Sequence, residues 1–285
     1  MSHTPLSAAE RAFYASPGRL TSLDGTAGSE DLPCTIADVA TLVQGLLLHE
    51  AFAADYGVTI ADERRAEMQL RSAAAMLRHL RELAPGPLGV PRPPERRLIG
   101  YCRHFSVLAT ALLRHAGVPA RARCGFGGYF RQGGRWIDHW VIEHWDAAAS
   151  RWVRSDMQFD AVLRQKLGLS FDPLHLPAGQ FLTGGEAWRR CRAGRANPAV
   201  FGIAEWWGAW FVRNNVVRDL AALNKLELLP WDSWGLMERS AGLGDGPADQ
   251  LVDAVAAATS TANWSAVRRL YAGDDRLRVP DALLG

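Results

Sequence analysis

The sequence has few cysteines, and no two of them are closely spaced. The four cysteines Cys34, Cys102, Cys124 and Cys191 are scattered over 285 residues, and none belongs to a C-x-x-C pair or to a zinc-ligand spacing. This spacing predicts neither a structural metal site nor a disulfide framework. We therefore expect reduced thiols, no metal and no other cofactor.

The chain also lacks an excess of charge and a long apolar run. Its 32 basic and 30 acidic residues give a net charge of +2, so charge provides no reason to expect nucleic acid as a partner. No apolar segment approaches a membrane span, and Met1 is not followed by a basic region and an apolar run. We expect a cytoplasmic protein that binds neither nucleic acid nor membrane.

The most informative stretch runs from residue 97 to residue 160. Cys102 opens an apolar helical pattern that ends at the Gly117-Val118-Pro119 segment, since Gly suits a helix end and Pro disfavours helical geometry before it. A thiolate in the first turn is stabilised by unpaired amides and by the positive end of the helix dipole. The backbone amide of Cys102 is therefore a candidate oxyanion donor, and Gln44 is a candidate for the second.

Three strand patterns follow this helix. Apolar and polar residues alternate over 118–126, again over 136–145 after a Gly-rich turn at 132–134, and again over 151–158. His139 shares its strand face with Val141 and Glu143, and Asp156 lies in the third strand. Antiparallel pairing of the second and third strands would bring Asp156 beside His139.

These three groups suit thiol chemistry. A thiolate is the nucleophile, an imidazole keeps it ionised and later protonates the leaving group, and a carboxylate orients the ring. His104 points to another side of the helix, and His144 lies on the opposite strand face from His139. Cys102, His139 and Asp156 are therefore the predicted catalytic residues.

The segment GYCRHFSVLATALLRHAGVPARARCGFGGYF, followed by DHW and then WVRSD, resembles the transglutaminase-like core of the papain-like thiol enzymes. The resemblance implies the roles of nucleophile for Cys102, general base for His139 and orienting acid for Asp156. Met157 departs from the Pro that usually follows this Asp in the family. The implied fold is α+β, with the Cys at a helix N-terminus packed on an antiparallel sheet that carries His and Asp, and with extra N- and C-terminal helices.

The rest of the chain is expected to complete one domain over 1–285. Apolar helices are predicted at 36–56 and at 63–83, the second capped by Asp62, and they form an N-terminal helical region over 36–84. The catalytic core spans 95–160, and a C-terminal helical elaboration spans 200–271. Further helices are predicted at 7–15, 161–167, 205–228 and 247–259.

Several other residues are candidates for substrate binding. Five of the 11 Trp residues fall within 206–234, a density that must be packed either as core or as the wall of an apolar pocket. Buried amides need partners, and a substrate can be one, while a strand arginine can anchor a carboxylate. The candidates are Tyr101, Arg123, Trp140, Glu143, Trp207, Asn214 and Asn215.

The predicted function is a thiol enzyme that forms an acyl-enzyme at Cys102 from an amide or an ester. It passes the acyl group to water or to an amine, and its substrate is a small molecule or a peptide. The chain would then be an amidohydrolase, a peptidase or an acyltransferase. A catalytically inactive binding or scaffold protein of the same fold is the alternative, and a metal site formed by Cys102 and His139 is a third reading with too few visible ligands.

Overall fold

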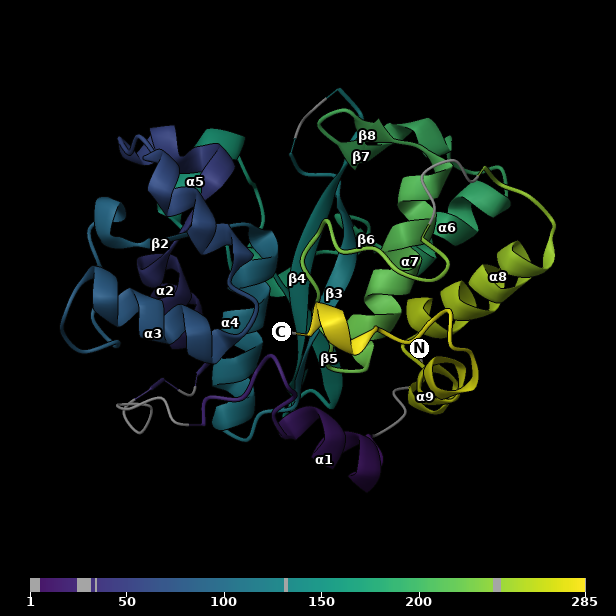
Figure 1. Ribbon diagram of the computed structural model, residues 1–285, viewed down its shortest axis with the longest axis horizontal. Coiled ribbons are helices and arrows are strands. Elements are labelled where there is room, and N and C mark those ends of the chain that lie inside the picture. The colour runs from purple at the N-terminus through teal and green to yellow at the C-terminus, as the bar shows by residue number, and fades with distance from the viewer. Residues whose placement is uncertain (1–5, 25–31, 34, 131–132, 238–241, 285) are drawn as a thin grey trace. The chain divides into compact units, whose positions relative to one another are not determined.

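The computed structural model describes residues 6–24, 32–33, 35–130, 133–237 and 242–284, so Cys34 and part of the turn at 132–134 lie outside the described residues. The chain has an α+β fold (Figure 1) and divides into two compact units. Unit 1 comprises Met1–Arg121 and Val141–Leu176, and unit 2 comprises Ala122–Trp140 and Pro177–Gly285. Each unit is described in turn.

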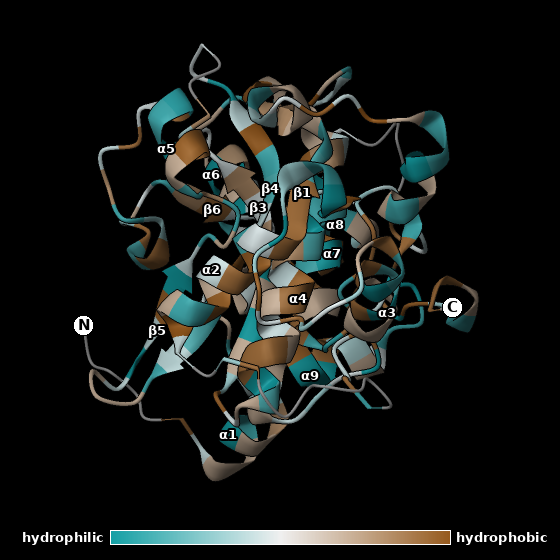
Figure 2. Ribbon diagram, turned by 90° about the vertical axis from the view of Figure 1, so that its left-hand side faces the viewer, coloured by the Kyte–Doolittle hydropathy of each residue, from teal (hydrophilic) through white to brown (hydrophobic). Residues whose placement is uncertain are grey.

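Unit 1 is mainly helical, and its core lies among α2, α3 and α4. Its 3-10 turns are Glu50–Tyr56, Asp62–Gln69, Pro94–Arg96 and Pro173–His175. Figure 2 shows the hydrophobic residues along α2 and α4, whose Val43, Leu46 and Leu108 are fully buried. The helices of this unit are α1 (Ala8–Ala15), α2 (Ile36–Leu46), α3 (Ala73–Leu83), α4 (Cys102–His115) and α5 (Ala161–Leu167), and its short strands are β1 (Leu47–His49), β2 (Leu98–Gly100) and β5 (Arg151–Ser155).

Two of the predicted N-terminal helices are shorter than expected. The helix predicted over 36–56 ends at Leu46, because Leu47–His49 pairs in parallel with Leu98–Gly100 as the β1–β2 sheet. The helix predicted over 63–83 starts only at Ala73, where the Ser72 hydroxyl accepts a hydrogen bond from the Ala75 amide (3.2 Å). Asp62 is not its cap, and that prediction is wrong. The helices predicted at 7–15 and 161–167 are confirmed.

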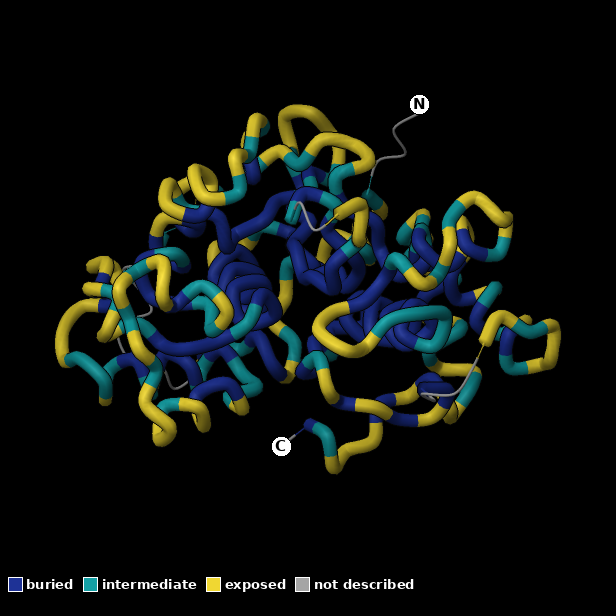
Figure 3. The backbone as a smooth tube through the Cα atoms, turned by 90° about the horizontal axis from the view of Figure 1, so that it is seen from above, coloured by how far each residue is buried: buried dark blue, intermediate teal, exposed yellow. Residues whose placement is uncertain are grey.

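Unit 2 is built on a sheet and the helices packed with it. Its helices are α6 (Gly184–Arg192), α7 (Ala209–Leu223), α8 (Pro247–Ser260) and α9 (Trp264–Gly273), and its 3-10 turns are Pro198–Val200 and Asp281–Leu283. Every residue from Phe211 to Leu223 is buried, so α7 is the central helix of the unit, with α6 and α8 beside it (Figure 1). Figure 3 marks such buried segments in dark blue and the exposed loops in yellow.

The sheet is mixed rather than purely antiparallel, which corrects the prediction. Its strand order is β6-β3-β4-β7-β8, and β5 also pairs with β4. Within unit 2, β3 pairs antiparallel with β6, whereas the start of β4 pairs in parallel with β7 through Trp136 and Phe201. The strands are β3 (Ala120–Gly127), β4 (Trp136–Asp146), β6 (Phe181–Thr183), β7 (Phe201–Ile203) and β8 (Trp206–Trp207). The predicted strands at 118–126 and 136–145 are thus confirmed.

The helix predicted over 205–228 is preceded by a hairpin. Gly202 pairs with Trp207 across the β7–β8 turn, so residues 206 and 207 are strand and α7 begins at Ala209. Gly208 separates the two elements with a φ of 110°, a conformation that favours glycine. The predicted dense packing of the tryptophans is wrong for two of them, because Trp206 is 37% exposed and Trp231 is 40% exposed.

Candidate active site

Cys102 is the first residue of α4, as the sequence predicts. Its side chain is only 7% exposed, and every residue from Cys102 to Arg114 is buried, so the helix is enclosed on all sides. Tyr101 precedes it as the N-cap in an extended conformation. The thiol therefore lies in the first turn of a buried helix.

His104 stabilises this start of α4 and is not available as a base. The Tyr101 amide donates to His104 Nδ1 at 3.1 Å, and the His104 amide donates to the Tyr101 carbonyl at 2.8 Å. Burial, together with the neighbouring Arg103, holds the pKa of His104 well below its usual range. The ring is therefore neutral, with Nδ1 as acceptor, and its orientation is set by the helix cap.

His139 lies in the middle of β4 and is 2% exposed. Two aromatic rings meet it edge-on: Tyr129, with centroids 5.9 Å apart, and Phe130, with centroids 5.0 Å apart. These two residues are not among the candidates predicted from the sequence, although a pair of aromatics directly after a strand is a visible signal. Their rings limit the rotation of the imidazole and shield it from water.

Asp156 comes directly after β5, which ends at Ser155 rather than at residue 158 as predicted. Its side chain is 1% exposed, its amide donates to the Pro173 carbonyl (2.8 Å), and its Oδ1 accepts from the Gln158 amide (3.0 Å). These bonds fix the carboxylate in place. The next turn also holds a residue that the sequence analysis missed: the buried side-chain amide of Gln158 has no hydrogen-bond partner within the described residues.

Glu143 does not border an open site, which corrects that prediction. It is 5% exposed, and its carboxylate accepts from Arg121 Nε at 2.8 Å and from Arg154 Nη2 at 3.0 Å. The Arg121 guanidinium also lies 3.8 Å from the Trp152 ring centroid. Glu143 therefore holds strands together through a buried ion-pair network.

Arg123 also forms a buried ion pair within the protein. It is 1% exposed, and its guanidinium makes two hydrogen bonds to Asp219 of α7, at 2.9 Å and 2.8 Å. The same side chain donates to the Thr259 carbonyl at 2.7 Å. The predicted role as an anchor for a substrate carboxylate is therefore wrong, because Asp219 already occupies the bidentate face of the guanidinium.

The two asparagines of α7 differ. Asn215 Nδ2 donates to Asp138 Oδ1 (2.7 Å), and Asn215 Oδ1 accepts from Arg218 Nη1 (3.0 Å). Both ends of its side-chain amide therefore have protein partners, and the amide does not need a substrate to satisfy it. Burial raises the pKa of the Asp138 carboxyl in this network. Asn214 is 3% exposed, and its Oδ1 has no partner among the residues that the structure describes. Asn214 therefore keeps the feature that suggested a ligand contact.

The aromatic candidates occupy three different environments. The Tyr101 ring meets the His49 ring edge-on, with centroids 5.7 Å apart. Trp140 is 1% exposed, and its Nε1 has no hydrogen-bond partner in the described part of the chain. Trp207 lies in the β7–β8 hairpin, where Nε1 donates to the Ala204 carbonyl at 2.5 Å and Arg135 lies 4.6 Å from its ring centroid. Their contacts with a substrate stay predictions.

The candidate residues are divided between the units. Tyr101, Cys102, Glu143 and Asp156 belong to unit 1, while Arg123, His139, Trp140, Trp207, Asn214 and Asn215 belong to unit 2. Gln44, the weak candidate for an oxyanion donor, lines a cavity of about 210 Å³ in unit 1 that Cys102 does not line. No three His, Cys, Asp or Glu side chains lie close enough to hold a metal ion in the described ranges.

Comparison with known families adds an independent observation. Residues 59–157 match the family model of the transglutaminase-like superfamily. The chain carries a transglutaminase-like domain. This domain contains Cys102, His139 and Asp156, and it begins well before residue 95, where the sequence analysis placed the start of the core.

The other two comparisons add no further resemblance. No curated protein and no solved structure matches the chain. The helices over the described residues are also too short or too polar to cross a membrane. The family assignment therefore concerns the domain at 59–157 and does not extend to the C-terminal helices α6 to α9.

Proposed function

We propose that this chain is a papain-like thiol enzyme that transfers an acyl group through an acyl-enzyme on Cys102. The observation that carries the proposal is that a single transglutaminase-like domain contains Cys102, His139 and Asp156 in the order of the family, with Cys102 as the first residue of a buried helix. The family match supports thiol chemistry as the type of reaction, and we place that reaction on these three residues.

The first half of the reaction forms a thioester. The Cys102 thiolate attacks the carbonyl carbon of an amide or ester, and the carbonyl electron pair moves to oxygen. The backbone amide of Cys102, at the start of α4, would stabilise such an oxyanion. When the tetrahedral intermediate collapses, the C–N or C–O bond breaks, and the protonated His139 gives its proton to the leaving amine or alcohol.

The second half returns the free enzyme. His139 removes a proton from water or from an amine, which attacks the thioester carbon, and the C–S bond then breaks to restore the thiolate. Tyr129 and Phe130 pack on the His139 ring and limit the access of water to it. This apolar lining favours an amine over water as acceptor, so acyl transfer is the form of the reaction that the site supports better.

The strand register supports Asp156 as the residue that orients His139. Ile142 and Ser155 are the last pair of the β4–β5 ladder, and extending its register by one residue would place Asp156 opposite Val141. His139 is two residues from Val141 along β4, and side chains two residues apart point to the same side of a strand. The proposed triad requires this common side.

Alkylation of the native protein with iodoacetamide at pH 7, followed by peptide mass mapping, tests the nucleophile. We expect Cys102 to react first. Cys124 is fully buried, and burial raises the pKa of Cys191 to about 11, so these two serve as internal controls and should react only after unfolding in urea. A Cys102 no more reactive than Cys191 would instead support an inactive binding or scaffold protein.

Two further measurements test the other steps. His139→Gln should slow the alkylation of Cys102 by about tenfold or more, since the imidazole keeps the thiol ionised. Incubation with p-nitrophenyl acetate should add one acetyl group to Cys102, and release of that group to water or to added hydroxylamine measures the partition between hydrolysis and transfer. An acetyl group that appears only on other side chains rules out Cys102 as the acyl carrier.

A further inference from the structure

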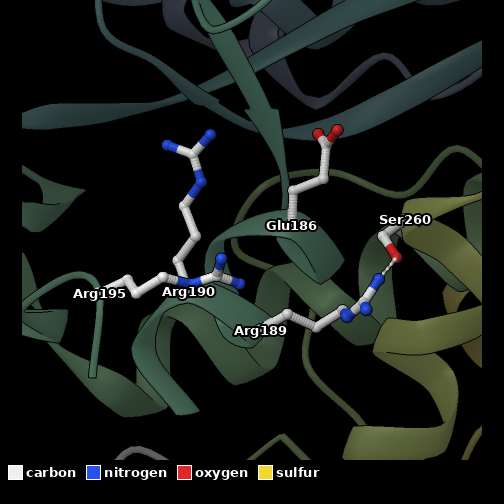
Figure 4. A pocket seen from close by; sticks show the side chains of 5 residues that line it. All are labelled: Glu186, Arg189, Arg190, Arg195 and Ser260. Carbon is white, nitrogen blue, oxygen red and sulfur yellow. Dashed lines mark hydrogen bonds between the residues drawn. The ribbon is translucent and has the colours of Figure 1, made fainter. Parts of the chain in front are cut away.

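The end of α6 carries an unusual concentration of arginine. The segment RRCRAGR places four arginines within residues 189–195. Arg192 is neutralised, because its Nε and Nη2 donate to the Asp253 carboxylate of α8 at 3.1 Å and 3.0 Å. The other three, Arg189, Arg190 and Arg195, line one cavity together with Glu186 and Ser260 (Figure 4). This group of five residues is called the arginine pocket below.

The arginine pocket has the size of a small-molecule site. Its volume of about 460 Å³ lies within the range of ordinary ligand pockets. All five residues belong to unit 2, and none of them is a candidate for the thiol chemistry. The pocket is therefore a second place on the chain where a ligand can bind.

The three guanidinium groups of the pocket are not neutralised by the protein. Within the described residues, Arg189 donates one hydrogen bond, to Ser260 Oγ at 3.0 Å, and neither it, Arg190 nor Arg195 has a carboxylate partner. The one carboxylate of the pocket, on Glu186, accepts from the Thr183 amide at 2.7 Å as part of the N-terminal cap of α6. Three positive charges thus face one negative charge.

The helix end explains how these arginines come together. Gly194 adopts a φ of 66°, its amide donates to the Cys191 carbonyl at 3.0 Å, and the Arg195 amide donates to the Arg190 carbonyl at 2.9 Å. This pattern of bonds is a Schellman motif, which folds the chain back over the last helical turn. Arg195 is thereby held next to Arg190 although it lies beyond the end of α6.

Close packing of α6 on α8 fixes the other wall. A Cβ atom on Gly185 would lie 2.5 Å from Thr259 Oγ1 and 2.7 Å from the Ala256 carbonyl oxygen, so the two helices touch through their backbones. Ser260 is the last residue of α8 and is held beside Arg189 by this contact. In the structure this packing places the Ser260 hydroxyl within hydrogen-bond distance of the Arg189 guanidinium.

A helix C-terminus favours basic residues, because they interact well with its free carbonyls. That effect accounts for Arg189 and Arg190, which lie in the last turns of α6, but it requires neither a cavity nor Arg195, which lies three residues past the helix. Arg192, at the same end of α6, differs from these arginines because the Asp253 carboxylate neutralises its charge. All three pocket arginines are exposed, so the pocket presents their positive charge to the solvent and to any anion in it.

The geometry points to a binding site for a small, multiply charged phosphate compound, a phosphate ester or a polyphosphate. The guanidinium fork matches two phosphate oxygens at once, and three such groups around one cavity suit an anion with more than one negative charge. The Ser260 hydroxyl adds a neutral donor on the α8 side. Carboxylate anions offer fewer oxygens at each charged centre and should bind less tightly.

Isothermal titration calorimetry of the full chain with sodium tripolyphosphate tests the site. We expect one binding event per chain, with Arg190→Gln and Arg195→Gln each weakening it about tenfold, since the loss of one charge-assisted contact corresponds to roughly that factor. Arg269→Gln is the matched control: Arg269 is an exposed arginine of α9 outside the pocket, and its loss should leave the dissociation constant unchanged. Circular dichroism of each variant verifies that it is folded.

Three other probes, at the same ionic strength, define the class of ligand. Glycerol 2-phosphate should compete with tripolyphosphate, whereas citrate, with a similar charge on carboxylates, should compete at least about tenfold less well. An equal effect of Arg269→Gln would show nonspecific attraction of anions and would overturn the proposal. Equal binding by citrate, or no binding of tripolyphosphate to the folded wild type, would also overturn it.

Discussion

At the level of single residues, the main finding is the amount of charge buried in unit 2. Arg123 and Asp219 are both almost fully buried and form a two-bond ion pair, and Asp219 Oδ1 also accepts from the Cys124 amide at 3.0 Å. Removing one member of such a pair leaves the other charge buried without compensation. We therefore expect Asp219→Ala to lower the free energy of unfolding by about 3–5 kcal/mol.

Urea unfolding, followed by circular dichroism, measures this loss. The matched control is Asp245→Ala, which removes an exposed ion pair instead of a buried one. The Asp245 side chain is 95% exposed, and its Oδ1 lies 3.1 Å from Arg192 Nη2. Solvent screens an exposed pair, so this variant should unfold at the same urea concentration as the wild type. Equal midpoints for the two variants would mean that burial does not determine the strength of these pairs.

Residue-level predictions fail most often where a partner is far away in the sequence. The sequence shows Arg123 and Glu143 as polar residues on strands, but Asp219 lies 96 residues after Arg123, and Arg121 lies 22 residues before Glu143. No local pattern contains these pairings, so the sequence alone presents both residues as available for substrate. The same limit explains Asn215, whose partner Asp138 is 77 residues away.

At the level of elements, the sequence predicts best where the determining signals are local. The apolar period and the Gly117-Val118-Pro119 ending specify α4, and its observed bounds agree with the pattern to within a residue. The predicted helix over 36–56 fails because Leu47–His49 pairs with Leu98–Gly100, a partner about fifty residues away that the helical period does not reveal. The β7–β8 hairpin was missed for a related reason: its two short strands are too brief for an alternating pattern.

The cap of α4 gives a pH-dependent prediction. The lowered pKa of His104 keeps its ring neutral in the folded chain, while the unfolded chain protonates it near its usual pKa of about 6.5. The unfolded state therefore binds more protons below that pH, so stability falls as the pH decreases. Between pH 7 and pH 5 this residue alone should remove about 2 kcal/mol from the free energy of unfolding.

Comparison of the wild type with His104→Gln isolates this effect. The glutamine oxygen can accept the Tyr101 amide hydrogen bond in place of His104 Nδ1, but it does not titrate. Urea unfolding at pH 7, 6 and 5 should show a smaller loss of stability in the variant, while all other titrating groups are shared. Parallel pH profiles would mean that His104 binds its proton equally well in the folded and the unfolded chain, which would contradict its lowered pKa.

At the level of the whole molecule, the chain path argues for one cooperative domain. The chain passes from one unit to the other after Arg121, after Trp140 and after Leu176, and both β3 and β4 contribute residues to each unit. A strand that unfolds in one unit therefore loses its continuation in the other. The single domain predicted from the sequence is an expectation that this interleaving supports.

Native-state hydrogen exchange of Asp219→Ala tests this expectation. Asp219 belongs to α7 of unit 2, whereas α4 belongs to unit 1, and the most protected amides are expected in these two buried helices. If the chain unfolds as one domain, the variant lowers the protection of both helices by the same free energy, since their slowest amides exchange only through global unfolding. A loss confined to α7, with α4 as protected as in the wild type, would show that unit 1 stays folded on its own.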